Sequence, residues 1–226
     1  KEAKELNLLG FYQKGPQKFY PMYKRMENYG LQIDEEARTS LRTKYTEMAT
    51  DYTYSIETFA GKNFNPRSTN QCCELLYGEY KLPIQKKKRA NGNKTPTADA
   101  DALEYLALNH ATDDPLVRGL LYNIITVRKI DKILDYINSV AHPDGRMRFR
   151  YKIAGTESGR TSTSQCDDYR WYLNKKDEKL DKHKYGISIQ QFPKHGYELI
   201  TGETIGNDLR GMFVASPGYV LIEWDQ

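Results

Sequence analysis

The chain has 226 residues, which suffice for one large domain or two small ones. Its 34 Lys and Arg residues against 30 Asp and Glu give a formal net charge of +4, which permits a nucleic-acid partner without requiring one. The three cysteines have neither disulfide-framework nor zinc-site spacing, and no apolar run reaches the roughly 18 residues that a membrane helix needs. These features argue against a disulfide-stapled domain and against a membrane span, and they favour a reducing compartment such as the cytoplasm.

Helical signals dominate the first two thirds of the chain. Apolar residues recur every three or four positions from Ala37 to Phe59, which predicts a long amphipathic helix that stops at Gly61. A second such run extends from Leu116 to Ile137. Residues able to cap a helix N-terminus precede each predicted helix: Asp34, Ser68, Thr97 or Asp99, and Asp114 with Pro115.

A basic segment interrupts this helical region. Residues 81–94 include no acidic residue, and their cations are Lys81, Lys86, Lys87, Lys88, Arg89 and Lys94. The turn signal at 91–93 predicts a loop. Such a loop is either solvated and flexible or grips nucleic-acid phosphates.

Period-two alternation begins after the turn at 142–145. Apolar residues at 147, 149, 151 and 153 alternate with the cations Arg146, Arg148, Arg150 and Lys152. This pattern predicts a half-buried strand whose outer face is either solvated or laid along a phosphate backbone. The following segment, 155–164, is rich in Gly, Ser and Thr and suits close approach to phosphates, although such clusters are usually plain loops.

The end of the sequence predicts a possible metal ligand. Charged residues fill 165–184, which we interpret as an inserted surface element, and 187–193 returns to an extended pattern. A short helical turn then precedes a predicted apolar strand, 221–225, that ends on Asp225. A carboxylate at the tip of such a strand can hold a divalent metal against phosphates, but the site needs a second carboxylate, and none is obvious upstream. A plain strand-end Asp is the alternative.

The order of these segments resembles the family A (Klenow-type) DNA polymerases, especially the phage members. The similar stretches are 26–34 (Met-Glu-Asn-Tyr-Gly-Leu-Gln-Ile-Asp), 64–83 (Phe-Asn through Leu-Pro), 158–162 (Ser-Gly-Arg-Thr-Ser), 190–193 (Gln-Gln-Phe-Pro) and 209–225. Thr161 stands where that family has Leu, and Lys194 lies near the position of an expected Arg. Gln226 follows Asp225 where Tyr is common, and the insertion 165–184 departs from bacterial members.

The resemblance implies an α+β fold and a division of the chain. We expect an entry segment with the first palm elements over 1–39, a helical thumb over 40–140, and a partial antiparallel palm over 141–226 that includes the insertion 165–184. The implied parent is a DNA-directed DNA polymerase, a nucleotidyltransferase of DNA replication that acts on primer-template DNA and deoxynucleoside triphosphates with two Mg²⁺ ions. The implied location is the cytoplasm of a bacterial or phage-infected cell, and a processivity partner stays open.

The resemblance also assigns site residues. Asp225 is the predicted catalytic residue and metal ligand, Arg160 the predicted contact to primer or template backbone, and Gln190 with Gln191 the predicted minor-groove contacts. The remaining predicted DNA-binding residues are Ser162, Lys194, Arg210, Lys86, Lys87, Lys88, Arg89, Lys94, Arg128 and Lys129. The ordinary alternatives are a salt bridge inside the palm for Arg160 and solvent exposure for the others.

Two other functions stay open. A non-catalytic nucleic-acid-binding module accounts for the basic segments without a second carboxylate. A metal-dependent nuclease needs carboxylates clustered near Asp225, and Glu223 points to the opposite face of the same predicted strand. Because the family's second catalytic Asp and nucleotide-binding residues are expected after Gln226, we expect these 226 residues to be a fragment that binds primer-template DNA weakly without extending it.

Overall fold

The structure, a computed structural model, describes residues 9–88, 92–111, 114–153, 155–166 and 186–222. Contacts divide the chain into two compact units. Unit 1 consists of Lys1–Thr39, Tyr136–Lys194 and Leu209–Gln226, and unit 2 of Ser40–Asp135 and His195–Asp208. Two of the boundaries between the units, at 39/40 and 135/136, fall within the two longest helices, and the other two, at 194/195 and 208/209, fall outside them.

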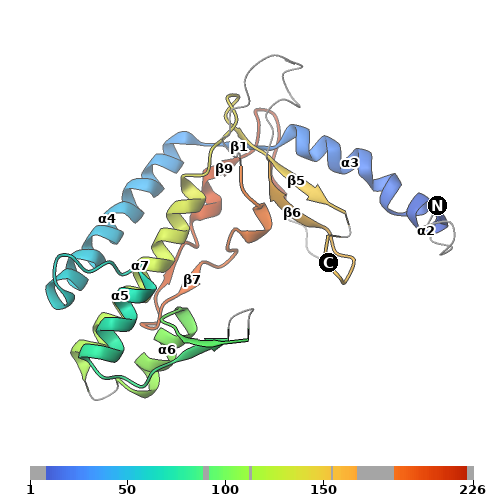
Figure 1. The fold of residues 1–226 in the computed structure, drawn as a ribbon. Coiled ribbons are helices and arrows are strands. Elements are labelled where there is room, and N and C mark those ends of the chain that lie inside the picture. Colours follow the sequence, from blue (N-terminus) through green and yellow to red (C-terminus); the bar gives the residue numbers. More distant parts are fainter. Residues whose placement is uncertain (1–8, 89–91, 112–113, 154, 167–185, 223–226) are drawn as a thin grey trace, which may run out of the picture. The chain divides into compact units, whose positions relative to one another are not determined.

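Helices make up most of unit 2 (Figure 1). They are α4 (Glu35–Ala60), α5 (Thr69–Cys73), a π-helix (Glu74–Glu79), α6 (Ala100–Asn109) and α7 (Pro115–Ile137), of which α4 begins and α7 ends in unit 1. Two antiparallel hairpins complete the unit: β2 (Lys86–Lys88) with β3 (Lys94–Pro96), and β7 (Tyr197–Glu198) with β8 (Thr204–Ile205). No helix in the described part of the chain is long and apolar enough to cross a membrane.

Capping side chains fix where these helices begin, as the sequence predicts. The four caps that accept backbone N–H groups are Asp34, Ser68, Asp99 and Asp114. The Asp34 carboxylate takes two such bonds, from Glu36 and Ala37, each at 3.0 Å. Gly61 ends α4 with φ +85°, the left-handed conformation that glycine adopts without strain.

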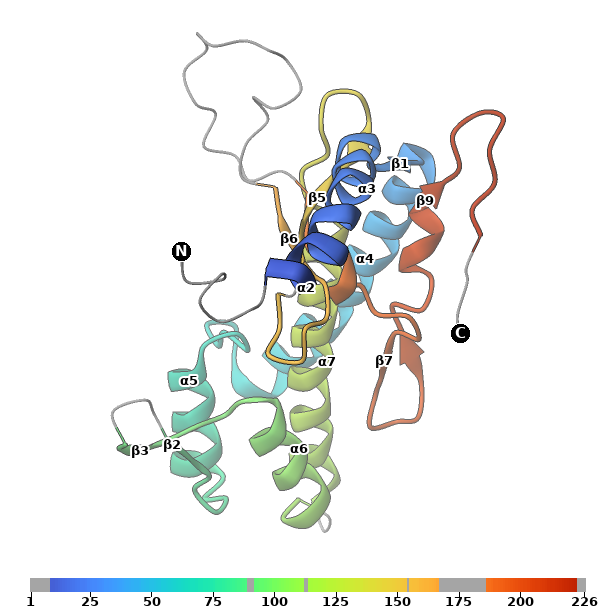
Figure 2. The same cartoon turned by 90° about the vertical axis from the view of Figure 1, so that its right-hand side faces the viewer.

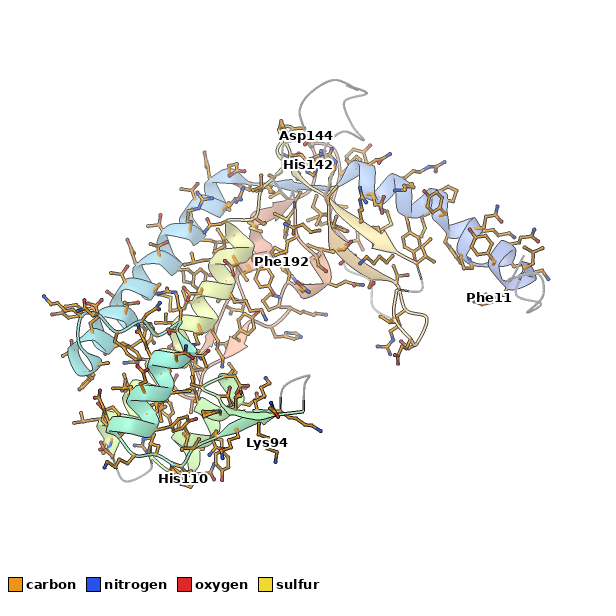
Figure 3. All side chains as sticks on the ribbon, in the orientation of Figure 1. Phe11, Lys94, His110, His142, Asp144 and Phe192 are labelled. Carbon is orange, nitrogen blue, oxygen red and sulfur yellow. The ribbon has the colours of Figure 1, made fainter. Side chains whose placement is uncertain are left out.

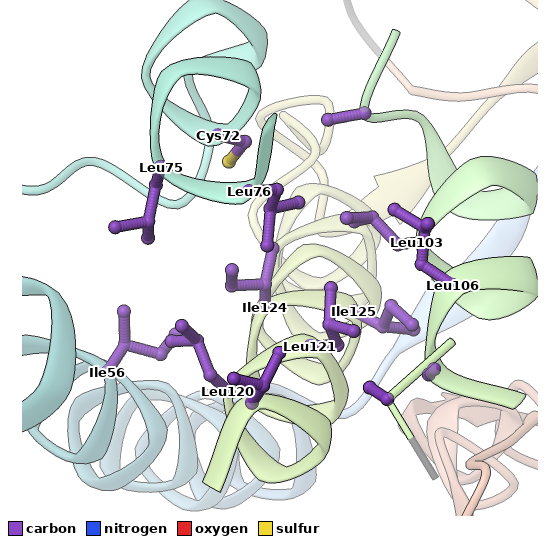
Figure 4. Packing of buried hydrophobic residues seen from close by; sticks show 14 of the residues in the cluster. Ile56, Cys72, Leu75, Leu76, Leu103, Leu106, Leu120, Leu121, Ile124 and Ile125 are labelled. Atoms are coloured by element: carbon purple, nitrogen blue, oxygen red, sulfur yellow. The ribbon is translucent and has the colours of Figure 1, made fainter. Parts of the chain in front are cut away.

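The core of unit 2 forms where the apolar faces of α4, α5, α6 and α7 converge (Figure 4). Fully buried side chains come from every one of these regions: Ile56, Cys72, Leu76, Leu103, Leu106, Leu120, Leu121 and Ile124. Each buried aliphatic side chain of this size contributes about 1.5 to 3 kcal/mol relative to exposure. The α7 residues at the centre of this cluster explain why the apolar repeat is so regular there.

The hairpin of residues 195–208 belongs to unit 2 together with residues 40–135, whereas the predicted division groups it with the rest of 141–226. Tyr45 of α4 is fully buried and donates its phenolic hydrogen to Asp208 Oδ1 at 2.5 Å, while its oxygen accepts the Gly206 N–H at 2.7 Å. Burial and the Asp208 carboxylate raise the pKa of Tyr45. Burial raises the pKa of Asp208, but the hydrogen bonds from Lys44 and Tyr45 outweigh it and hold that pKa below its usual range. These hydrogen bonds join residues more than 160 positions apart, so the local sequence does not predict them.

Unit 1 is built on short antiparallel strands. β1 (Leu31–Ile33) lies between β4 (Arg146–Met147) and β9 (Phe213–Val214) in a three-stranded sheet. β5 (Phe149–Lys152) pairs with β6 (Ser162–Gln165) as a hairpin, and these two strands lie side by side in Figures 1 and 2. The helices α2 (Leu9–Lys14) and α3 (Pro16–Tyr29) precede β1, and 3₁₀ turns cover Ile189–Gln191 and Leu209–Met212. The predicted α+β class is confirmed.

The predicted cationic strand face at 146–152 is wrong, because two of its four cations bond inside unit 1. Arg148 is 6% exposed; its guanidinium donates to the Asp144 carboxylate, at 2.8 Å for Oδ1, and to the Asn28 carbonyl at 2.8 Å. Arg146 stacks over the Tyr29 ring, with its guanidinium carbon 4.4 Å from the ring centroid. The chain is therefore divided into β4 and β5 at Arg148, and no continuous cationic face exists there.

Two further extended segments also differ from expectation. Within 187–193, the residues Ile189–Gln191 form a 3₁₀ turn instead of a strand. In the predicted strand 221–225, Leu221 and Ile222 are 58% and 79% exposed and pair with no described strand. A strand needs a partner for its backbone N–H and C=O groups, so apolar composition alone does not establish one. Residues 223–225 lie outside the described part of the chain.

A buried histidine occupies the turn before β4, where His142 and Asp144 lie together (Figure 3). Burial lowers the pKa of His142, and the Arg148 guanidinium lowers it further. The Arg146 carbonyl, 3.3 Å from Nδ1, and the Asp144 carboxylate act in the opposite direction but do not outweigh burial. The folded chain therefore binds a proton at His142 less readily than the unfolded chain does.

We predict that the stability of unit 1 falls as the pH is lowered below about 6.5, because the unfolded chain then binds a proton at His142 that the folded chain resists. Urea unfolding between pH 7 and pH 5 measures this, with His142→Gln as the non-titrating control. The wild-type free energy of unfolding should drop more steeply than that of the variant. Equal slopes for the two proteins would contradict the assignment.

Candidate nucleic-acid interface

The predicted DNA-binding residues are distributed over both units. Unit 1 contains Arg160, Ser162, Gln190, Gln191, Lys194 and Arg210. Unit 2 contains Lys86, Lys87, Lys88, Lys94, Arg128 and Lys129. Asp225 and Arg89 lie outside the described residues, so their roles stay predictions. Each unit is therefore considered separately.

The loop between β5 and β6 presents Arg160 on a defined turn. The Thr156 hydroxyl accepts the Arg160 N–H at 3.0 Å, and the Gly159 N–H donates to the Thr156 carbonyl at 2.9 Å. Gly159 has φ +75°, a conformation that a residue with a side chain rarely adopts. The Arg160 side chain itself is exposed and has no hydrogen bond or ion pair to any described residue. The turn thus offers a guanidinium that is available to a phosphate, and Ser162 follows it as the first residue of β6.

Gln190 has a different role from its neighbour Gln191. Its amide oxygen accepts the Thr163 N–H at 2.9 Å, and its amide nitrogen donates to the Thr161 carbonyl at 3.0 Å. Gln190 therefore pairs with the edge of β6 much as another strand would. Gln191 is exposed and makes no side-chain bond to the described residues, so it is the glutamine whose amide is free to meet a ligand.

Arg210 lies beside the same turn. Its Nη2 atom is 3.5 Å from the Phe192 carbonyl oxygen. Phe192 is buried, with its ring centroid 4.8 Å from that of Tyr136 and 5.3 Å from that of Phe213. These ring contacts fix the position of the turn. Lys194, two residues after Phe192, is exposed.

The basic segment of unit 2 is a β-hairpin, not the predicted loop. Lys88 of β2 stands opposite Lys94 of β3, where Figure 3 labels Lys94. Like charges directly opposite each other on two strands repel, and a bound phosphate would relieve that repulsion. Lys87 points to the other face and pairs with Asp99 at 2.7 Å. This bond raises the pKa of Lys87 and lowers the pKa of Asp99.

Arg128 and Lys129 on α7 are engaged inside unit 2. The Arg128 guanidinium donates to the carbonyls of Pro66, at 2.8 Å, and Ala98, and to the Cys72 sulfur at 3.2 Å. Lys129 donates to the Glu198 carbonyl at 2.7 Å. The geometry favours a structural role for both cations, because their donors already join loops and a hairpin to α7.

The described residues do not form the metal site that the resemblance implies. Within residues 9–222, apart from the undescribed gaps, no group of three or more His, Cys, Asp or Glu side chains could hold a metal ion. The predicted ligand, Asp225, lies outside this part of the chain, so its metal-binding role stays a prediction.

Sequence reasoning missed two residues that hold the Arg160 loop, Tyr23 and Glu27 of α3. Tyr23 bonds to Thr161, and Glu27 bonds to the backbone of β5. A signal was present: Tyr23 and Glu27 are four residues apart, so they share one helix face, and a carboxylate beside an aromatic ring on such a face indicates a polar contact.

The fold is that of a polymerase domain. The POL domain of Pol1 from M. smegmatis, solved in a complex with DNA primer-template and dNTP, matches 97% of this chain with a TM-score of 0.68 at 22% identity. This chain covers 32% of that one. No protein-family model matches the sequence.

The sequence relatives are DNA polymerases. DNA polymerase I of Rhizobium leguminosarum is 25% identical over 227 residues, covering 96% of this chain and 18% of the relative, and the thermostable DNA polymerase I of Thermus caldophilus is 26% identical over 222 residues, covering 98% and 22%. The DNA polymerase of Escherichia phage T5 is 28% identical over 182 residues, covering 77% and 17%. The chain is thus similar to bacterial and phage DNA polymerases, which agrees with its predicted resemblance to family A, and it spans about a fifth of the length of these relatives.

We predict that Gln190→Ala destabilises unit 1 by about 0.5 to 1.5 kcal/mol, because the edge of β6 loses two hydrogen bonds. Gln191→Ala is the matched control and should change the free energy of unfolding by less than about 0.5 kcal/mol. Urea unfolding measures both variants. An equal effect of the two substitutions would show that the Gln190 bonds contribute no stability.

Proposed function

We propose that this chain is part of a DNA-directed DNA polymerase of family A, in which unit 1 belongs to the palm and unit 2 to the thumb. The observation that carries this proposal is the similarity to DNA polymerases over 96% and 98% of the chain, which covers both units. The whole protein would perform template-directed nucleotidyl transfer in DNA replication, with primer-template DNA and deoxynucleoside triphosphates as its substrates.

The exposed cations supply the grip on DNA in this proposal. Arg160 would contact a backbone phosphate from its preformed turn, and the opposed Lys88 and Lys94 would contact duplex phosphates. Gln191 would reach minor-groove acceptors that all base pairs share. Such contacts recognise duplex DNA without selecting a sequence, which a replication enzyme requires.

Asp225 would hold the catalytic divalent metal, for which Mg²⁺ is the proposed ion. A bound Mg²⁺ would activate the primer hydroxyl and stabilise the leaving pyrophosphate. In the described residues the contribution is positioning: the turns that carry Arg160 and Gln191 are fixed by hydrogen bonds to β6 and within the loop.

The non-catalytic binding module and the metal-dependent nuclease are the competing functions. No contact among the described residues favours either of them. The similarity to two bacterial DNA polymerases extends over 96% and 98% of the chain, which favours the polymerase.

We predict that Arg160→Ala weakens binding to primer-template DNA about tenfold, because one charge-assisted phosphate contact is lost. The slope of log affinity against log salt should become shallower by about 0.9. Fluorescence anisotropy with a labelled primer-template at several salt concentrations measures both quantities. Lys62→Ala removes an exposed cation outside the predicted set and is the control. An unchanged salt slope for Arg160→Ala would contradict the phosphate contact.

The catalytic part of the proposal has its own test in the full-length gene product. Asp225→Asn should lower the rate of nucleotide incorporation at least about a hundredfold, because a metal-bound carboxylate is replaced by a neutral amide. Affinity for primer-template should stay within about threefold of wild type, since no predicted DNA contact is removed. Substantial incorporation by the variant would overturn the role of Asp225.

A further inference from the structure

Helix α3 is attached to unit 1 by polar bonds more than by an apolar face. Within α3, all of which is described, Glu27 is the buried residue, while Phe19, Tyr20, Met22 and Met26 are between 44% and 53% exposed. The helix runs past β5 (Figure 1). Its position against β5 therefore depends on a few specific contacts, and these lead to the loop that carries Arg160.

The first contact covers the free edge of β5. One edge of β5 pairs with β6, and on the other the Tyr151 N–H donates to Glu27 Oε1 at 2.7 Å. Glu27 is 6% exposed, and its second oxygen pairs with Lys24. A buried backbone N–H without a partner costs about as much as a lost hydrogen bond, so Glu27 fixes the strand at this point.

The second contact reaches the loop itself. The Tyr23 hydroxyl lies 3.1 Å from Thr161 Oγ1, and the Tyr23 ring packs on Tyr151 with ring centroids 5.0 Å apart. Thr161 directly follows Arg160. The tie between α3 and the loop therefore involves one side-chain hydrogen bond and one aromatic contact.

Together these contacts hold the loop backbone on both sides of Arg160. The Arg160 N–H is held by Thr156 on one side, and Thr161 is held by Tyr23 on the other. The Arg160 guanidinium makes no hydrogen bond or ion pair to the described residues. A charged group on a fixed backbone loses less conformational freedom when it binds a phosphate, which strengthens binding.

We propose that Tyr23 and Glu27 are positioning residues of the DNA site, which hold the β5–β6 hairpin and its loop so that Arg160 meets a backbone phosphate. This inference rests on the proposed function for its ligand. The positioning of the loop, in contrast, is a property of the protein without DNA.

The test combines Tyr23→Phe, Thr161→Val and Arg160→Ala with primer-template binding by fluorescence anisotropy. Tyr23→Phe removes one oxygen atom and should weaken binding between about twofold and tenfold. Thr161→Val should give the same loss, and the double variant no further loss, because both single variants break the same bond. In the Arg160→Ala background Tyr23→Phe should have no effect, a result that general destabilisation would not produce.

Glu27 has a conservative variant that separates its two bonds. Glu27→Gln keeps an oxygen acceptor for the Tyr151 N–H and should retain binding within about twofold, whereas Glu27→Ala should weaken it by more than Tyr23→Phe does. The matched control is Tyr12→Phe, since Tyr12 is 53% exposed on α2 and makes no side-chain bond to the described residues. It should bind like wild type.

Hydrogen exchange without DNA distinguishes the two ways in which the inference could fail. Tyr23→Phe should speed exchange of the Gly159 and Arg160 amides at least about threefold, because the closed loop opens more often. Faster exchange with no DNA binding by the wild-type protein would overturn the proposed function and leave the loop brace in place. Unchanged exchange, or equal losses of affinity from Tyr23→Phe with and without Arg160, would overturn the positioning role.

Discussion

The hydrogen bond from the Tyr151 N–H to the Glu27 carboxylate is the constraint on which the β5–β6 hairpin and its Arg160 loop depend. It joins residues 124 positions apart and covers the strand edge that β6 leaves open. A second tie, from Arg148 to the Asn28 carbonyl, holds the end of the same helix. Gly30 completes the fit: with φ +66°, an added Cβ would lie 2.8 Å from the Met147 carbonyl oxygen, so only glycine allows this approach. The position of the Arg160 loop depends on these contacts between α3 and the strands.

The cationic side chains differ in whether they are already bonded within their own unit. Arg128 and Arg148 donate to carbonyls and carboxylates of their own units, which favours a structural role for both. Arg160 has no such partner among the described residues, and Lys88 and Lys94 face each other with like charge. A net charge of +4 therefore says little about affinity for DNA. Arg160 lies on a hydrogen-bonded turn, and Lys88 and Lys94 lie on a hairpin, so the backbone at these cations is held by contacts within its own unit.

Local physics explains what the sequence predicts well. Caps such as Asp34 and the regular apolar spacing of α7 predict where the helices begin and end to within a few residues. The helical region can therefore be predicted from the local sequence alone. The errors arise where a distant residue decides. Alternation at 146–152 predicted a cationic strand face, but Asp144 and Asn28 draw Arg148 inward. The hydrogen bonds of the Gln190 side chain to the edge of β6 were likewise not predicted, because pairing between segments far apart in the sequence leaves no local pattern.

The most direct test of this account is a hydrogen-exchange footprint of the protein with and without primer-template DNA. The account predicts protection in two places, the 155–162 loop and the β2–β3 hairpin, because these carry Arg160 and the opposed Lys88 and Lys94. It predicts little change on α7 around Arg128, whose guanidinium is already bonded within unit 2. Binding that protects the α7 surface and leaves the 155–162 loop unchanged would contradict it.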